Sequence, residues 1–180
     1  AELIPAGMNV HGVPFKLETR EELNGMACKG NVLKLPADCT YNRLYILAAA
    51  ASDKDVKGIF RVGKYVQEVI VPSYTGFIGQ WGHTGHTEGY LKDAEVAYVG
   101  MHRHSGEGDQ PYEFTYMFKF AIDLPEKATE VVLPDNKDIV IFAATLTDVA
   151  ATSVCPASEL FRTANKCNRY QTESSTERVN

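Results

Sequence analysis

The sequence lacks long apolar runs and has fewer basic than acidic residues. Its longest apolar run, Leu44–Ala51, has the length of one strand, whereas a membrane-spanning helix needs about 20 such residues. The 18 Lys and Arg residues against 23 Asp and Glu give a net charge of −5, and a mildly acidic surface repels phosphate backbones. We therefore expect no membrane span, and neither nucleic acid nor an anionic membrane surface as a partner.

Paired cysteine motifs are also missing. The four cysteines, Cys28, Cys39, Cys155 and Cys167, form no C-x-x-C pair, which leaves zinc-ribbon and thioredoxin-like motifs without support. The even count permits disulfides without requiring them, and Cys155–Cys167 is the pairing we favour if one forms. The sequence also has no G-x-S-x-G motif and no glycine-rich phosphate loop, so the common hydrolase and nucleotide-binding signatures are absent.

Aromatic residues, in contrast, are plentiful, with nine Tyr and eight Phe. In Tyr112–Ile122 every even position is aromatic or aliphatic, and most odd positions are polar or small. This period of two is typical of a strand, which places Tyr112, Phe114, Tyr116, Phe118 and Phe120 on one face. We interpret this stripe as core rather than as a binding platform.

Further strands are expected where apolar or alternating segments lie between turn-forming residues. These segments are Val13–Leu17, Gly25–Cys28, Asn31–Leu35, Arg43–Ala50, Phe60–Val71 (a hairpin that turns at Gly63 and Lys64), Glu95–His102 and Asp138–Leu146. Strands and helices do not alternate, so the pattern predicts an all-β fold over residues 1–150, with the strand spacing of antiparallel sandwiches and barrels. Residues 151–180 are expected to form a partly helical or disordered extension.

Four of the five histidines gather in two short segments. On a strand, His102 and His104 point to one face and could share a metal ion, with His83 and His86 as further imidazole ligands. However, an H-x-x-H pair in a glycine-rich loop usually faces solvent, and the spacing matches no zinc signature. From spacing alone we predict no metal ligand.

The same two segments suit sugar recognition, because a pyranose stacks on an aromatic ring and offers hydroxyls to polar side chains. Trp81, the only tryptophan, is flanked by Gly79, Gln80 and Gly82, in a loop that could expose its indole. The alternative is an indole packed at the edge of the core. The candidate ligand-binding residues are Gln80, Trp81, His102, Arg103 and His104, with Tyr112 or Tyr116 in support.

Two acidic groups could hold calcium through oxygen ligands. They are Asp53 with Asp55, and Glu107 with Asp109 and Glu113. Neither group has EF-hand spacing, and a solvated turn is the commoner explanation, so we expect no cofactor. Nucleophilic catalysis has no better support, because nothing in the sequence activates Ser105 beside His104.

A family resemblance is carried by six segments through their order along the chain: Gly12–Leu17, Tyr41–Ala50, Tyr74–Trp81, Ala97–Ser105, Asp123–Pro125 and Leu133–Asn136. Over about residues 3–148 they resemble the C-terminal β-sandwich region of bacterial α-mannosidases of glycoside hydrolase family 38 and of mannosidase-like proteins. The resemblance implies an antiparallel jelly-roll-like β-sandwich, galactose-binding-like in form, that accompanies a separate zinc-dependent catalytic domain. That domain is not in this sequence, so we do not expect this chain alone to be an enzyme.

The resemblance therefore implies a non-catalytic, carbohydrate-associated module with end loops that contact glycan. Its partner would be a mannose-containing glycan or a glycoside hydrolase catalytic domain, and its location would be secreted or periplasmic. Two alternatives stay open. One is a purely structural domain that buttresses a catalytic neighbour, and the other is a small metalloprotein that uses His83, His86, His102 and His104.

Overall fold

The structure, a computed structural model, describes residues 6–18, 24–37, 39–76 and 94–148. This part of the chain contains eleven strands and no helix, so none of its elements is a helix that could cross a membrane. The strands are β1 (Gly7–Val10), β2 (Val13–Lys16), β3 (Met26–Ala27), β4 (Val32–Lys34), β5 (Arg43–Ala50), β6 (Val56–Val62), β7 (Tyr65–Val71), β8 (Glu95–Ser105), β9 (Gly108–Asp123), β10 (Glu130–Val132) and β11 (Ile139–Thr147).

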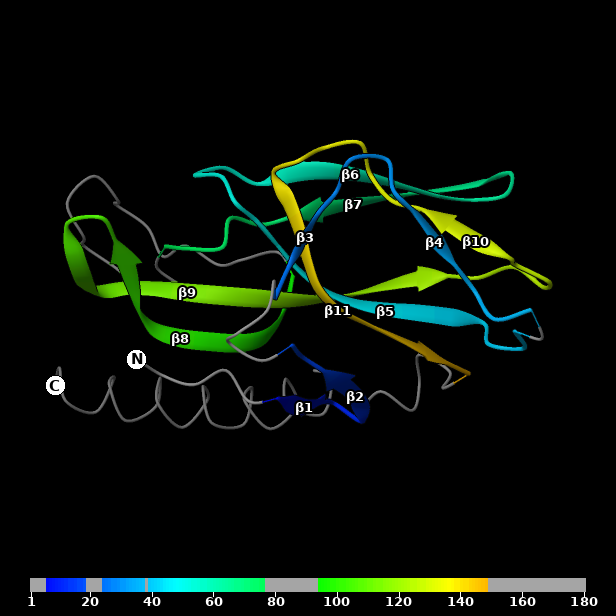
Figure 1. Cartoon of the computed structure of the whole chain (residues 1–180), viewed down its shortest axis with the longest axis horizontal. Coiled ribbons are helices and arrows are strands. Elements are labelled where there is room, and N and C mark those ends of the chain that lie inside the picture. The colour runs from blue at the N-terminus through cyan, green and yellow to red at the C-terminus, as the bar shows by residue number, and fades with distance from the viewer. Residues whose placement is uncertain (1–5, 19–23, 38, 77–93, 149–180) are drawn as a thin grey trace, which may run out of the picture.

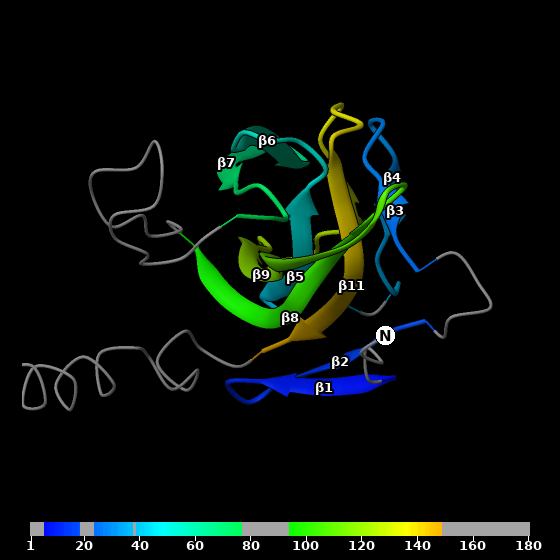
Figure 2. The same ribbon diagram turned by 90° about the vertical axis from the view of Figure 1, so that its left-hand side faces the viewer.

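The strands form three sheets, and paired strands run antiparallel throughout (Figure 1). One sheet has the order β4-β10-β6-β7, the second has the order β3-β11-β5-β9-β8, and β1 pairs only with β2. Seen from the end, the four-stranded sheet lies on one face of the five-stranded sheet, and the β1–β2 hairpin lies on the opposite face (Figure 2). The fold is therefore a two-sheet sandwich with a small third layer.

The main core lies between the two larger sheets. Strand β5 contributes Leu44, Ile46 and Ala48, and Phe60 of β6 and Val131 of β10 belong to the same cluster. Each of these side chains is at most 1% exposed. Such interdigitation of two inner faces is the usual way in which a β-sandwich is stabilised.

A second core lies on the other face of the five-stranded sheet, under the β1–β2 hairpin. There Tyr45 and Leu47 of β5 pack with Val13 and Phe15 of β2 and with Met117 of β9. A strand that is covered on both faces needs apolar side chains at odd and even positions alike. For this reason polar and apolar residues do not alternate along β5.

A buried cation lies beside this second core. Lys119 of β9 is 3% exposed, and its Nζ donates to the backbone oxygen of Val10 at 3.2 Å and lies 2.8 Å from Oε1 of Glu95. The ammonium also lies 5.3 Å from the ring centre of Tyr45. These contacts tie the β1–β2 hairpin to β8 and β9.

The all-β antiparallel sandwich predicted from the sequence is confirmed. Arg43–Ala50 has the predicted bounds, and β6 and β7 turn at Gly63, whose φ of 58° favours glycine. The short strands β1 and β10 were not predicted. The predicted extension at 151–180 and the pair Cys155–Cys167 lie outside the described residues, whereas Cys28 and Cys39 are free thiols.

Candidate metal centre

The β8–β9 hairpin is longer than the sequence pattern indicates. The prediction placed the strands at Glu95–His102 and Tyr112–Ile122, but pairing continues to Ser105 and Gly108 at the turn. Gly108 has a φ of 118°, and the Ser105 hydroxyl donates to its backbone oxygen at 3.0 Å and accepts from the Glu107 amide at 3.2 Å. Ser105 is thus a turn residue, and its hydroxyl is not directed at a histidine.

The far part of this hairpin is a two-stranded ribbon, which we call the distal ribbon (residues 100–113). Strand β9 pairs with β5 only from Phe118 to Asp123, but it pairs with β8 up to the turn. In Figure 1 the ribbon extends beyond the ends of β5 and β11, at the left. Side chains at its tip therefore lie on the outer surface of the molecule.

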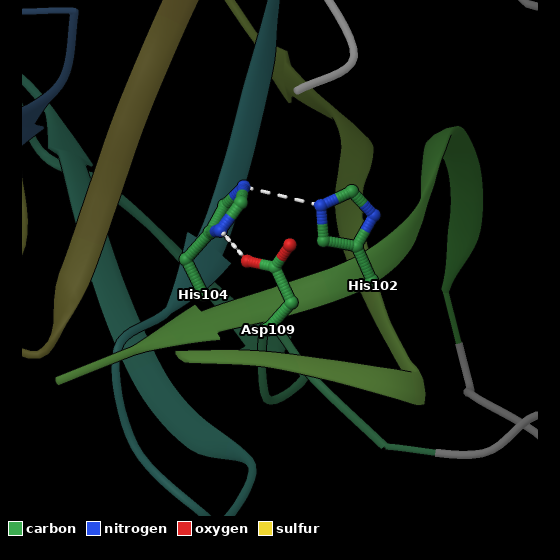
Figure 3. A group of neighbouring side chains, drawn as sticks. All are labelled: His102, His104 and Asp109. Carbon is green, nitrogen blue, oxygen red and sulfur yellow. Dashed lines mark hydrogen bonds and ion pairs between the residues drawn. The ribbon is translucent and has the colours of Figure 1, made fainter. Parts of the chain in front are cut away.

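Three potential metal ligands meet on one face of the distal ribbon (Figure 3). His102 and His104 are two positions apart on β8 and so share a face, and Asp109 of β9 is the direct cross-strand partner of His104. Nδ1–H of His104 donates to Oδ1 of Asp109, and the two Nε2 atoms of the histidines lie 3.1 Å apart. In the described part of the chain this is the one group of three such residues that could hold a metal ion.

The separation of the two Nε2 atoms matches that of two ligands on one ion. A Zn–N bond of about 2.0 to 2.1 Å implies an N···N distance of about 3.3 Å at a tetrahedral angle and about 2.9 Å at a right angle. The observed 3.1 Å lies between these values, and without an ion it is the length of a hydrogen bond between the two imidazoles. Since Asp109 accepts the Nδ1 proton of His104, the lone pair of that imidazole is on Nε2, where an ion would bind.

The role of Asp109 in this arrangement is that of an orienting partner. Metal-binding histidines usually donate their other ring N–H to a carboxylate or carbonyl, which fixes the tautomer and the ring orientation. The side chains of His104 and Asp109 are 59% and 65% exposed, so coordination positions that protein does not fill would be open to solvent. Imidazole nitrogens favour zinc, copper or nickel over calcium, which prefers six to eight oxygens.

Arg103 does not join this cluster. Strand alternation directs it to the opposite face of the ribbon, where its Nε donates to Oε1 of Gln110 at 2.6 Å and its guanidinium lies 3.8 Å from the Glu113 carboxylate. The three consecutive residues His102, Arg103 and His104, grouped as one ligand-binding set on the sequence, are thus divided between two faces.

Tyr116 also lies away from the ligand surface. It is 4% exposed, its hydroxyl donates to the Gly76 backbone oxygen at 2.9 Å, and burial raises the pKa of that hydroxyl. Its ring packs near Phe118, as the core interpretation of the stripe predicts.

Tyr112 belongs to β9. Gln80, Trp81, His83 and His86 lie outside the described residues, so their predicted roles stay predictions.

The carboxylates considered for calcium do not converge. Asp55 accepts a hydrogen bond from the Ser73 amide at 3.1 Å, Glu113 lies with Arg103, and Glu107 is in the exposed turn. Within the described residues no group of three carboxylates surrounds a common point, and of the carboxylates considered for calcium only Asp109 belongs to a group of three potential ligands.

The pairing of Asp109 with His104 was not predicted. The sequence stretch that indicates this pairing is His104-Ser-Gly-Glu-Gly-Asp109. A turn centred on Gly106 and Glu107 places residues 104 and 109 opposite each other. Both strands carry polar side chains there, so no alternation of apolar and polar residues indicates a strand. The second strand was therefore expected to begin only at Tyr112.

The fold and the surface site define a β-sandwich domain with a potential metal-binding hairpin. Residues 1–150 match the family model of the AziU2-like beta-sandwich domain, and the chain belongs to that family. A search of curated proteins found no match.

This family assignment corrects the resemblance drawn from the sequence. The prediction of a glycoside hydrolase family 38 α-mannosidase C-terminal region is wrong, because the matching family is a different one. The segments that carried the resemblance are short stretches of apolar residues with proline, glycine and asparagine among or beside them. Such segments recur in unrelated β-sandwiches, so their order does not specify a family.

Proposed function

We propose that this chain is a non-catalytic binding domain that holds a divalent transition-metal ion on the distal ribbon. His102 and His104 would each supply Nε2, and Asp109 would orient His104 through Nδ1. The observation that carries the proposal is the 3.1 Å separation of the two Nε2 atoms together with the carboxylate on the far side of one ring. Zinc is the ion with which we propose to test the site, because imidazole nitrogens are among its usual ligands.

Support for a binding role rather than a catalytic one comes from the surroundings of the cluster. The hydroxyl nearest in sequence, that of Ser105, is engaged within the turn, so Ser105 does not give the His104–Asp109 pair the nucleophile that a hydrolytic triad requires. The described cavities lie elsewhere, for example a groove of about 600 Å³ between the β6–β7 turn and Pro125–Glu130.

Calorimetric titration with zinc, after removal of metal by a chelator, tests the proposal. The wild-type chain should bind zinc with an affinity that falls by about tenfold or more in His104→Ala, because one of two imidazole ligands is lost. Unchanged zinc affinity in both His102→Ala and His104→Ala would refute the site. Circular dichroism of each variant verifies that the fold is retained.

His11 offers a matched control. It is an exposed histidine that pairs with a carboxylate, Glu95, but the described residues place no second imidazole in a group with it. His11→Ala removes the same chemical group from the same molecule. Zinc affinity should therefore be unchanged in this variant.

Saccharide contact through the same end of the molecule is a second candidate function. The exposed His104 and Asp109 side chains favour it, since imidazole and carboxylate groups both bond to hydroxyls. Titration with mannose and mannobiose, measured by calorimetry, tests it. A saturable change that disappears in Trp81→Ala supports sugar binding, and no change at millimolar sugar removes this candidate. A structural domain that buttresses a neighbour is compatible with the same fold.

A further inference from the structure

Within the described residues, the proposed site has too few ligands to enclose an ion. A closed zinc site is tetrahedral and uses four protein ligands, whereas this cluster offers two imidazoles and a carboxylate that is already bonded to one of them. The cluster lies on the exposed face of a projecting ribbon, so a second molecule can approach it. The two remaining positions could be filled by water or by two further imidazoles.

The outer edge of β8 has features that favour pairing with a strand of another molecule. In the described part of the chain, β8 is an edge strand, and an isolated pair of strands is only marginally stable in water. Val99 and Met101 are 43% and 58% exposed immediately before the histidines. Native proteins usually shield such edges with charge or prolines, because an exposed apolar edge pairs with other strands.

We infer that zinc at this site is shared with a second copy of the chain. This inference rests on the metal-binding function proposed above. In an antiparallel pairing of two β8 edges about a two-fold axis near Arg103, His102 and His104 of both copies lie on the same sheet face. Four imidazoles then surround one ion, and Val99 and Met101 lie along the shared edge.

Analytical ultracentrifugation of the full chain with and without zinc, combined with metal analysis, tests this inference. The expected result is a monomer without zinc and a dimer that contains one zinc ion per two chains. His104→Ala should lose both the ion and the dimer. Met101→Lys keeps the ligands but places a charge at the shared edge, so it should weaken the dimer about tenfold or more. Val66→Lys, at a similarly exposed apolar position on β7, should leave the dimer unchanged.

The outcomes separate the two proposals. One zinc ion bound per monomer, lost in His104→Ala, would overturn the shared site and leave the metal-binding function standing. No zinc bound at all would overturn both. A dimer that persists in His104→Ala without zinc would show that the copies associate by another surface, and would also overturn the shared site.

Discussion

His104 lies directly across the β8–β9 hairpin from Asp109, and its ring bonds to the carboxylate on one side and faces His102 on the other. This relationship follows from register. A four-residue turn places positions 104 and 109 opposite each other, and the alternation of side chains along β8 adds His102 to the same face. The metal-binding proposal depends on that register.

Asp109→Asn should weaken zinc binding about 10- to 100-fold, because the amide holds the imidazole of His104 less well in the metal-binding tautomer. Glu107→Gln, in the adjacent turn, removes the same charge without touching a histidine and should have little effect. Calorimetry on both variants measures the difference. Equal losses in the two would show that overall negative charge, and not the orientation of His104, governs the affinity.

Zinc binding should weaken as the solution is made acidic. Both histidines must be neutral to ligate the ion, so protons compete with the metal for Nε2. Calorimetric titration with zinc at a series of pH values checks this directly. Binding that is independent of pH down to the range where imidazoles are protonated would exclude histidine ligands.

Gly58→Ala should destabilise the sandwich by about 1 to 3 kcal/mol, the usual cost of overpacking a core. A Cβ at this buried position in β6 would lie 2.9 Å from Cδ1 of Ile139 and 3.1 Å from Cγ of Pro134. Gly106→Ala is the control, since a Cβ there has no atom within 4 Å. Urea denaturation measures both, and a Gly106 variant that loses as much stability would contradict the packing account.

Lys119→Ala should lower the free energy of unfolding by about 1 to 3 kcal/mol, because the Val10 carbonyl and Glu95 lose their buried donor. The exposed pair Lys57–Glu68, 2.7 Å apart, provides the comparison, and Lys57→Ala should cost about 0 to 1 kcal/mol. Hydrogen exchange should also show faster opening of β1 and β2 in the Lys119 variant. Equal stability of the two variants would mean that the buried contacts contribute nothing.

Cys28 should react with alkylating reagents far more slowly than Cys39 in the folded protein. Cys28 is 0% exposed, and burial raises the pKa of its thiol to about 11. At mildly alkaline pH this lowers its thiolate fraction by about two orders of magnitude. Peptide mass spectrometry after timed labelling compares the two cysteines, and similar rates would indicate that the main core opens readily.

Most of the sandwich could be predicted because burial on one or both faces leaves a period in the sequence. The apolar run at Arg43–Ala50 and the alternation around Phe118 gave β5 and the inner part of β9 directly. The distal ribbon has polar residues on both strands, so no hydrophobic period marks it. The register of the ribbon is set by the turn, and this register brings His104 and Asp109 together. The spacing of residues along one strand could not predict that contact.

The most direct test of the account is an anomalous difference map, recorded at the zinc absorption edge, from crystals of the zinc-loaded protein. We predict a peak about 2.0 to 2.1 Å from Nε2 of both His102 and His104, with Asp109 still bonded to Nδ1 of His104. A zinc peak at other side chains, with these two imidazoles facing solvent, would contradict the proposed metal centre.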